Sequence, residues 1–348
     1  MNNSNPQKTK KGLREIASAA HVSIATVSRV LNGNSRVDRT IQKTVQDAAA
    51  NLNVNFSPRN KVKALAFLLS NNAMLHAFHS QILIGAEAYV AAQGWDMVFL
   101  SFNYSPKISW KELHLPMVVQ RRDVVRAVML AGTNSTNLIE MLAHKAIPSV
   151  VLGNNILDEI RDFVSNDIVF SDDIGGAQDM TRYLIGMGHR HIWFVGNTRL
   201  PWFARCFDGY SRAMKAAELA PRQSSIDSED DTEIGYLGTK SLLARREAVT
   251  AIFSGNDPTA HGVYKALRDS GLRIPEDISV AGCDDTVGAL LYPQLTTIRK
   301  FPIQLGKQMA RVALDRIANP SLEVQCAIIP TELVKRDSCR RINSFALH

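Results

Sequence analysis

The sequence predicts a small all-α head of three helices that contains a helix-turn-helix, followed by an α/β core of two doubly wound lobes. Three observations predict this class. Two short amphipathic helix patterns lie near the start with a break between them, positive charge is concentrated in residues 1–63, and short apolar runs alternate with helical patterns from residue 64 onward. With 348 residues, the chain has room for two or three domains with a sizeable core.

The first helix pattern covers residues 13–20, where apolar residues recur at helical spacing. His21-Val22 interrupts this pattern. Ser23 then occupies an N-cap position, where its hydroxyl oxygen can accept hydrogen bonds from the free N–H groups at the start of a second helix. One face of that second helix is apolar, with Val27, Val30 and Leu31. A helix pair with small residues at the crossing is typical of a helix-turn-helix, whose second helix lies in a major groove.

The opposite face of the second helix carries side chains that suit DNA. Arg29 can place two donors on guanine O6 and N7, and Ile24 with Ala25 can contact thymine methyl groups. The residues expected to contact DNA are Ser23, Ile24, Ala25, Thr26, Ser28, Arg29, Asn32, Arg36 and Arg59. The alternative for this pattern alone is an ordinary helical hairpin inside an enzyme.

The charge distribution favours DNA over that alternative. Residues 1–63 hold eleven Lys and Arg against three acids, a net charge of +8. The whole chain has a net charge of +7, so the remaining residues together carry −1. A basic patch on a small N-terminal unit is the electrostatic signature of a nucleic-acid binder, and a solvated basic tail would not explain the packed helix pair inside it.

A third helix is expected from about Asp38, a candidate N-cap, to Leu52, with Ile41 and Val45 among its buried residues. The head then covers residues 12–57, after a basic disordered tail at 1–11. Residues 58–63 form a linker, since the chain there is polar and contains a proline at its start. The core covers residues 64–340.

The core alternates strand and helix patterns. Candidate strands lie at 64–69, 97–100, 127–130, 149–152, 192–195, 251–253 and 279–281. Amphipathic helix patterns lie between them at 82–92, 177–187, 207–217 and 260–269. This alternation predicts parallel sheets covered by helices on both faces. Its length, about 285 residues, exceeds one usual domain and predicts two similar lobes.

Polar residues follow most of these strands, where open α/β sheets bind ligands. They are Asn71-Asn72, Gly132-Thr133-Asn134, Gly153-Asn154-Asn155, Gly196-Asn197, Gly255-Asn256-Asp257 and Asp284-Asp285. Facing strand ends with amide and carboxylate groups would suit a hydroxyl-rich ligand. The alternative is that half or more of these residues only turn the chain, because Asn, Asp and Gly are standard turn residues.

The sequence lacks the residue patterns that are typical of several other classes of protein. No apolar run approaches the roughly 18 residues of a membrane span, and the start has no apolar signal region, so we expect a cytoplasmic protein without a membrane partner. The four cysteines form no C-x-x-C pair, and no phosphate-binding loop or hydrolase motif occurs, so no cofactor is expected. His189 and His191 could form a metal pair, but no acidic or Cys partner clusters nearby, so no metal is expected. Cys283 has no identified His base and is expected to be a small buried residue.

The residues also carry a family resemblance. The run Val22-Ser23-x-Ala25-Thr26-Val27-Ser28-Arg29-Val30-Leu31-Asn32-Gly33 closely resembles the helix-turn-helix signature of the lactose/galactose-repressor (LacI/GalR) family. Matches continue in Gly188-His189-Arg190, Thr250-Ala251-Ile252-Phe253, Gly271-Leu272-Arg273-Ile274-Pro275-Glu276-Asp277-Ile278-Ser279-Val280 and Leu295-Thr296-Thr297-Ile298. The resemblance covers about residues 12–337, although residues 71–122 match poorly.

The resemblance implies a periplasmic-binding-protein-like core in which the chain crosses between the lobes three times. One lobe would hold about 64–165 plus 297–325, and the other about 166–296 plus 326–340. It also implies a homodimer or tetramer that binds double-stranded operator DNA and responds to a small effector, most often a sugar. The implied function is a transcriptional regulator, a repressor rather than an activator and not an enzyme.

The resemblance also implies effector contacts. By position these fall on Arg205, Asn256 and Asp284, and more loosely on Phe78 and His79. Trp202 with Phe203 could add a stacking face, and Arg205 and Asp284 could bind sugar hydroxyls through charge-assisted hydrogen bonds. The alternative role for Arg205 and Asp284 is an ion pair between the lobes.

The linker departs from the family pattern. Phe56-Ser57-Pro58-Arg59 resembles the entry to the family's hinge helix, but only six residues then separate Pro58 from Leu65. The family's leucine, which is inserted into the minor groove, has no counterpart. Kinking a base step with an apolar side chain costs a few kcal/mol, offset by added contacts. We therefore expect weaker operator bending, with Arg59, Lys61 and Lys63 lying along the DNA backbone or minor groove.

Two other functions remain open at this point. A cytoplasmic solute-binding or sugar-processing protein would have the same two-lobe α/β core, but it would not need the basic helical head. An architectural DNA binder would have the head but would sense nothing, and the polar strand ends argue against it.

Overall fold

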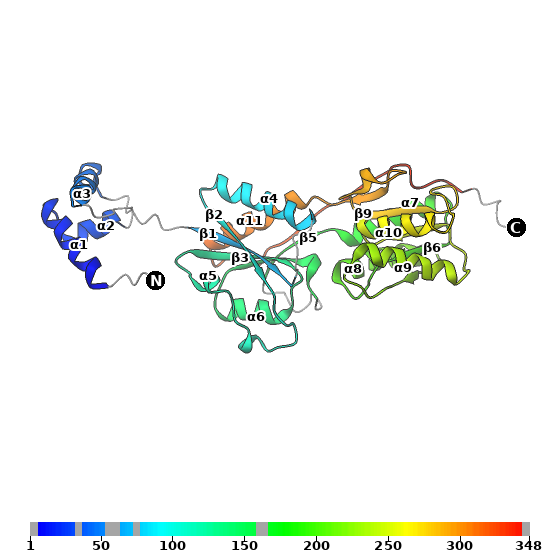
Figure 1. The fold of residues 1–348 in the computed structure, drawn as a ribbon, viewed down its shortest axis with the longest axis horizontal. Coiled ribbons are helices and arrows are strands. Elements are labelled where there is room, and N and C mark those ends of the chain that lie inside the picture. Colours follow the sequence, from blue (N-terminus) through cyan, green and yellow to red (C-terminus); the bar gives the residue numbers. More distant parts are fainter. Residues whose placement is uncertain (1–5, 32–36, 53–62, 72–76, 158–165, 343–348) are drawn as a thin grey trace. The chain divides into compact units, whose positions relative to one another are not determined.

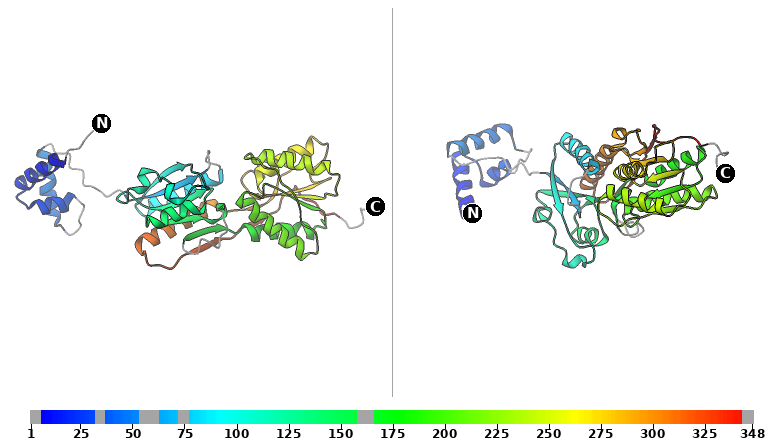
Figure 2. Two further views of the ribbon diagram at one scale, coloured as in Figure 1. Left: turned by 90° about the horizontal axis from the view of Figure 1, so that it is seen from below. Right: turned by 45° about the vertical axis from the view of Figure 1, so that its right-hand side comes forward.

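The computed structural model describes residues 6–31, 37–52, 63–71, 77–157 and 166–342. The chain forms two compact units, a head within residues 1–63 and a core that begins at Ala64 (Figures 1 and 2). In the described part of the chain, no helix is both long enough and apolar enough to cross a membrane.

The head consists of three helices, α1 (Pro6–Ala19), α2 (Ile24–Leu31) and α3 (Arg39–Asn51) (Figure 1). Its interior is a cluster of small and β-branched side chains contributed by all three helices. These are Ile16, Ala17, Ala20, Val27, Val30, Val45, Ala48 and Ala49. The predicted three-helix head is confirmed, as is the burial of Val27 and Val30 on the apolar face of its second helix, whereas the side chain of Leu31 is not among those described.

The turn between α1 and α2 is fixed by backbone hydrogen bonds. His21 adopts a left-handed conformation with φ 53°. The Val22 N–H donates to the Ala17 carbonyl at 3.0 Å, and the His21 N–H donates to the Ser18 carbonyl at 3.3 Å, which is the Schellman pattern of a helix C-terminus. The Thr26 N–H then donates to Ser23 Oγ at 3.0 Å, so Ser23 caps α2 as predicted.

Two details of the predicted head were wrong. α1 begins at Pro6, so residues 6–11 continue the helix rather than forming a disordered tail. A proline at the first helical position followed by Gln and Lys favours a helix without any apolar periodicity.

In α3, Asp38 accepts from the Thr40 N–H at 2.8 Å as expected. Ile41 and Leu52, however, are 37% and 41% exposed, so the buried face of α3 is limited to Val45, Ala48 and Ala49.

The first lobe is built on an all-parallel sheet with strand order β11-β5-β4-β3-β1-β2. Its strands are β1 (Ala64–Ser70), β2 (Asp96–Phe102), β3 (Val125–Gly132), β4 (Ser149–Leu152), β5 (Asp167–Ser171) and β11 (Cys326–Ile329). Helices α4 (Ala77–Ala92) and α11 (Pro302–Ala318) cover one face, and α5 (Met117–Gln120) and α6 (Thr136–His144) cover the other (Figure 1). The main core lies between the sheet and the pair α4 and α11.

The second lobe repeats this plan with strand order β12-β10-β9-β8-β6-β7, in which only β12 is antiparallel. Its strands are β6 (Ile192–Val195), β7 (Arg222–Ser224), β8 (Ala251–Ser254), β9 (Ser279–Asp284), β10 (Thr296–Arg299) and β12 (Glu332–Val334). Helices α7 (Asp173–Gly186) and α8 (Pro201–Ala216) pack on one face, and α9 (Asp231–Ala244) and α10 (Asp257–Arg268) pack on the other. The predicted pair of similar doubly wound lobes is confirmed.

The chain passes between the two sheets three times, after β5, after β10 and after β11. The expected lobe boundaries need correction at each passage. β5 and β11 belong to the first sheet, since Val150 of β4 pairs with Asp167 and Cys326 pairs with Ile168. β10 belongs to the second sheet, where Thr296 pairs with Ala281. The strand pairing decides lobe membership, and periodicity along the sequence does not reveal it.

Helices α4 and α11 approach each other unusually closely. A Cβ atom on Gly306 would overlap the carbonyl oxygen of Ile82, and one on Gly85 would overlap the carbonyl oxygen of Ile303. Each helix therefore contributes a glycine that allows direct contact with the backbone of the other. This contact holds the middle of α4 against the first turns of α11, and the same helix α4 carries Phe78 and His79 in its first turn.

Candidate functional site

The outward face of α2 combines apolar and cationic side chains. Ser23, Ala25 and Arg29 are exposed, and Ile24 is 46% exposed although it is large and apolar. Thr26 is half-buried, and its hydroxyl lies 2.9 Å from Ser23 Oγ. An isoleucine and an arginine that are both exposed on one short helix supply the apolar and cationic groups that contact base edges.

Not all predicted DNA contacts fall on this face. Ser28 is half-buried in α2, on the same helix as Arg29. Asn32, Arg36, Arg59 and the linker 58–63, except Lys63, lie outside the described residues. The DNA contacts of all nine residues therefore remain predictions.

Some of the polar residues at strand ends are structural. Asn134 is fully buried and accepts a hydrogen bond from Ser70 Oγ at 2.7 Å. Gly132 adopts φ +77°, and its position leaves no room for a side chain beside the Ser70 carbonyl. These residues join the ends of β1 and β3, so the turn interpretation is right for this pair of strands.

Phe78 and His79 lie at the start of α4, near the end of β4. His79 is buried, and its Nε2 lies 3.1 Å from Asn155 Nδ2. Phe78 is half-buried, and the Lys300 ammonium group lies 5.6 Å from the centre of its ring. The loosely aligned aromatic pair therefore belongs to the strand-end region of the first lobe.

A buried polar network that the sequence analysis missed connects the first two passages between the lobes. Asp173, the first residue of α7, accepts from Asn154 Nδ2 at 2.7 Å and pairs with Lys300 Nζ at 3.2 Å. Asn154 also exchanges hydrogen bonds with the Ser171 backbone, donating to its carbonyl at 2.8 Å and accepting from its N–H at 2.7 Å. Lys300 follows β10 directly, and a basic residue placed at a strand end is the signal that could have identified it.

Arg205 contacts the other lobe through an aromatic ring. It lies on α8, and the centre of its guanidinium group is 4.9 Å from the ring of Phe170 on β5. Its Nε is buried and has no hydrogen-bond partner among the residues that the structure describes. Trp202 is half-buried, but Phe203 is fully buried in the core, so the expected stacking face formed by both side chains is wrong. Phe170 is an aromatic ring that the sequence analysis missed.

Asn256 caps α10. Its side-chain oxygen accepts from the Thr259 N–H at 2.8 Å, and its Nδ2 donates to Asp231 at 2.7 Å. The residue is buried, so its amide is largely committed to holding the helix start. A ligand role for Asn256 remains a prediction.

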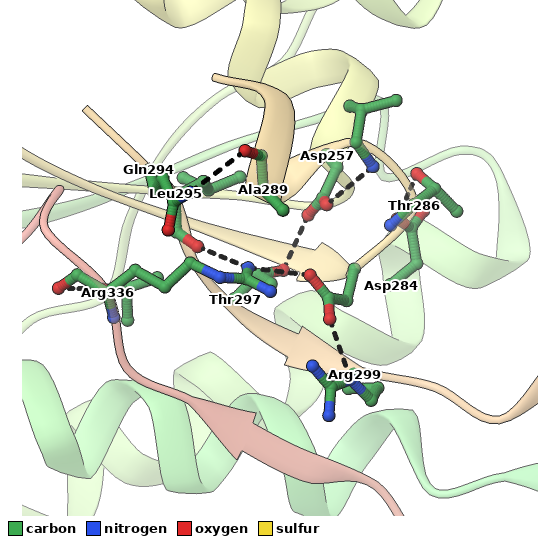
Figure 3. A network of polar contacts seen from close by, with 12 residues as sticks. Asp257, Asp284, Thr286, Ala289, Gln294, Leu295, Thr297, Arg299 and Arg336 are labelled. Atoms are coloured by element: carbon green, nitrogen blue, oxygen red, sulfur yellow. Dashed lines mark hydrogen bonds and ion pairs between the residues drawn. The ribbon is translucent and has the colours of Figure 1, made fainter. Parts of the chain in front are cut away.

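Asp284 ends β9 in a left-handed conformation with φ 102°. Its carboxylate accepts from the N–H of Thr286 at 3.1 Å and from its hydroxyl at 2.7 Å, so it turns toward its own loop (Figure 3). Burial raises the pKa of Asp284, and the negative charge of Asp257 acts in the same direction. None of the ion pairs among the described residues joins Arg205 to Asp284. The structure therefore does not support the alternative in which these two residues form an ion pair between the lobes.

Two further acids lie close to Asp284. Asp257 accepts from the Thr297 hydroxyl at 2.6 Å, and burial raises its pKa to about 6 (Figure 3). Asp285 pairs with Arg299 at 2.8 Å and with Arg336 at 2.7 Å. These pairs fix the loop after β9 against β10 and the segment that follows β12.

The histidine and cysteine alternatives have structural roles. His189 is fully buried, with Nδ1 3.0 Å from Thr250 Oγ1 and Nε2 3.1 Å from the Arg340 carbonyl. Cys283 Sγ lies 3.7 Å from Cys206 Sγ inside the core of the second lobe. In the described ranges, no three His, Cys, Asp or Glu side chains are grouped so that they could hold a metal ion.

A helix-turn-helix head on two lobes of the same strand order defines a regulator of the two-lobe ligand-binding class. Residues 12–58 match the model of "Bacterial regulatory proteins, lacI family", and residues 181–339 match that of "Periplasmic binding protein-like domain". The chain belongs to the lacI family and is a DNA-binding transcriptional regulator.

Full-length relatives support this assignment. The chain is 28% identical to the HTH-type transcriptional repressor PurR of Haemophilus influenzae over 95% of this chain and 99% of the relative. It is 29% identical to the ribose operon repressor of the same species, over 94% and 98% of the two chains. A solved complex of the transcriptional regulator CelR with cellobiose is 26% identical, with a TM-score of 0.69 over 94% of this chain and 99% of that one.

Proposed function

We propose that α2 binds the major groove of an operator and that Arg29 is its main base-contacting residue. The observation that carries this proposal is the exposed face of α2, where Arg29, Ile24 and Ala25 stand outward while Val27 and Val30 are buried. Arg29 would bind guanine through two donors, and the two apolar residues would contact thymine methyl groups. Ser23, Thr26, Ser28, Asn32, Arg36 and Arg59 would add phosphate or base contacts.

The net charge of +8 in residues 1–63 would supply the attraction that does not depend on sequence. The experiment selects a preferred site from random duplexes and measures its affinity by fluorescence anisotropy at several salt concentrations. We expect specific binding that weakens steeply as salt rises. If no duplex is bound at moderate ionic strength, the chain would instead be a two-lobe solute-binding or sugar-processing protein.

The effector would be a sugar that contacts the carboxyl ends of the strands in both lobes. Support comes from the names of similar proteins, a ribose operon repressor and a CelR complex with cellobiose. The proposed contacts are Phe78, His79, Trp202, Arg205, Asn256 and Asp284. Calorimetry against a sugar library, repeated with the protein bound to its operator, tests this role. An architectural DNA binder would show no ligand heat and no change in operator affinity.

The working form would be a cytoplasmic homodimer or tetramer that represses transcription. Large apolar side chains of the core stand exposed, including Ile84 at 58%, Leu290 at 82% and Tyr292 at 95%. Exposed apolar residues of this size favour burial against a second copy of the chain. Sedimentation equilibrium tests the oligomeric state, and a monomer at micromolar concentration would refute it.

A further inference from the structure

We propose that the effector carries an acidic group, a carboxylate or a phosphate, and that Lys300 and Arg205 bind it. This inference rests on the proposed function, because it concerns the chemistry of the same effector. It adds Lys300 as a specificity-determining residue that the sequence analysis did not include. Both cations contact residues at or just after the end of β5, and among the ion pairs of the described residues only Lys300 has a carboxylate partner.

Lys300 is only 9% exposed and lies directly after β10. Its ammonium group pairs with Asp173 at 3.2 Å, and the ring of Phe78 lies 5.6 Å away on another side. An ammonium group has three donors and is strongly hydrated in water, so burying it beside one carboxylate leaves part of its hydration unreplaced. A ligand acceptor at this point would replace that lost hydration.

Asp173 compensates the charge of Lys300 only in part. Its second carboxylate oxygen accepts from Asn154 Nδ2 at 2.7 Å. Asp173 is also the first residue of α7, where the free N–H groups and the helix dipole stabilise a negative charge. The contacts observed for this carboxylate are those with Asn154 and Lys300, and the dipole of α7 adds to the stabilisation of its charge.

Arg205 has no carboxylate partner among the ion pairs of the described residues. Its guanidinium group lies over the Phe170 ring, and its buried Nε has no acceptor within the described ranges. A guanidinium group binds carboxylate or phosphate through two parallel hydrogen bonds, and an aromatic ring beneath it fixes its plane. Because Nε has no acceptor among the described residues and the Phe170 ring fixes the plane of the guanidinium group, Arg205 can supply one side of an anion-binding site.

The partners of both cations lie on one short segment of chain. Phe170 contacts Arg205, and Asp173, three residues later, contacts Lys300. Asp284, which the sequence analysis considered as an ion-pair partner of Arg205, accepts hydrogen bonds from Thr286 instead. Burial raises the pKa of Asp284, and the positive charge of Lys300 acts in the opposite direction. A neutral sugar would leave the guanidinium group of Arg205 without a carboxylate partner, whereas a sugar acid or sugar phosphate would supply one.

The test compares each neutral sugar with its own acidic derivatives on the full-length protein. The panel is D-glucose, D-glucuronate and glucose 6-phosphate, then D-galactose with D-galacturonate, and D-ribose with ribose 5-phosphate. Calorimetry gives affinity, and anisotropy gives the effect on operator binding. We expect at least one acidic compound to bind about 10- to 100-fold more tightly than its neutral parent, the effect of added hydrogen bonds between charged groups. The two acidic forms of glucose and the ribose phosphate distinguish a carboxylate from a phosphate ligand.

Variants then assign the preference to the two cations. Lys300→Gln and Arg205→Gln should each reduce the preference for the acid to a few-fold, whereas Lys307→Gln, at an exposed position on α11, should leave it unchanged. Because Lys300→Gln leaves Asp173 buried without its cation, the double variant Lys300→Gln/Asp173→Asn keeps the site neutral. It should fold and show the same loss.

The outcomes separate this inference from the proposed function. If neutral sugars bind as tightly as their acids and change operator affinity, the acidic effector is refuted and the sugar effector stands. If the preference for the acid survives in the Lys300 and Arg205 variants, these two residues are refuted as its ligands. If no member of the panel binds or changes operator affinity, both the acidic effector and the sugar effector are refuted.

Discussion

His189 provides a direct test of how the core is held together. It is fully buried just before β6, and its ring bridges Thr250, which precedes β8, and the Arg340 carbonyl near the C-terminus. With a neutral ring, Nε2–H donates to the carbonyl and Nδ1 accepts from the hydroxyl. Burial lowers the pKa of His189 from 6.5 to about 4, because the charged ring loses its hydration.

The lowered pKa gives a stability change with a definite sign. Between pH 6.5 and 4 the unfolded chain binds a proton at this histidine and the folded chain does not, so stability falls as the pH falls through this window. At 1.36 kcal/mol for each pKa unit, the loss approaches about 3 kcal/mol at the acid end. Asp257 acts in the opposite direction. Its pKa is raised to about 6, so its own contribution makes the fold more stable as pH falls below 6.

The assay compares the full chain with His189→Gln, which can still donate to the Arg340 carbonyl but does not titrate. Amide hydrogen exchange of residues 338–342 and urea unfolding are measured at half-unit steps from pH 4 to 7.5. The contribution of Asp257 is common to both proteins and cancels in the difference. We expect the pH dependence of the variant to be flatter by up to about 3 kcal/mol. His261→Gln, at an exposed position on α10, is the matched control and should behave like the original chain.

The same pH dependence in the original chain and in His189→Gln would refute the reasoning. It would mean that water reaches the ring or that the segment carrying Arg340 opens without cost. Faster exchange of that segment at pH 5 than at pH 7 in the original chain, lost in the variant, would confirm that protonation releases it.

Three further predictions concern the head and the core. Arg29→Ala should weaken binding to the selected operator by about 1–3 kcal/mol and relax the preference at one base pair in anisotropy titrations, whereas an equal loss on all sequences would make Arg29 a phosphate contact. Ser23→Ala should cost the head about 1 kcal/mol in thermal unfolding, because the Thr26 N–H loses its acceptor, and Ser23→Asp should retain the cap. Gly306→Ala should destabilise the core by about 1–3 kcal/mol or more, because the new methyl group would overlap the Ile82 carbonyl. Gly186→Ala, where no heavy atom lies within 4 Å, should be harmless and serves as its control.

The linker gives one more prediction, which concerns residues outside the described part of the chain. Since no leucine stands where the family inserts one into the minor groove, operator bending measured by circular-permutation mobility should be weak. A sharp kink at the centre of the operator would refute this.

The head could be predicted from the sequence because its interactions are local. Ser23 caps the helix that begins at the next residue, and His21 breaks the pattern of α1 at the residue that adopts a left-handed conformation. The apolar faces recur at the helical period, so packing follows from spacing. The start of α1 was missed because its first turns contain only polar residues, for which the apolar pattern carries no signal.

The core was predicted in class but not in detail. The seven predicted strands are present, whereas β5, β7, β10, β11 and β12 were not identified as strands. β7 and β12 are three residues long, which is too short for a recognisable alternation. β5, β10 and β11 lie next to the passages between lobes, and their pairing partners decide which lobe they join.

The effector region shows why local patterns could not reveal the site. Asn256 was correctly expected after a strand. Its side-chain oxygen, however, caps α10 by accepting from the Thr259 N–H, and asparagine makes side-chain hydrogen bonds of this kind to the backbone in many turns. Lys300 and Asp173 are distant in sequence, and no periodicity relates them. The position of the Arg205 guanidinium group is set by its contact with the ring of Phe170, which lies on a strand of the other lobe. Contacts of this kind are set by the fold of both lobes together.

The position of the Lys300–Asp173 pair has a consequence for regulation. Asp173 follows the first passage between the lobes, and Lys300 lies at the second, so the pair connects the segments through which one lobe continues into the other. A ligand can shift a conformational equilibrium only through a difference in its affinity for the two states. An acidic ligand that bound Lys300 would join Asp173 at the same ammonium group, and its affinity would therefore depend on the arrangement of these segments. A neutral ligand would lack this dependence, so the charge of the effector is itself part of how the two lobes would respond to it.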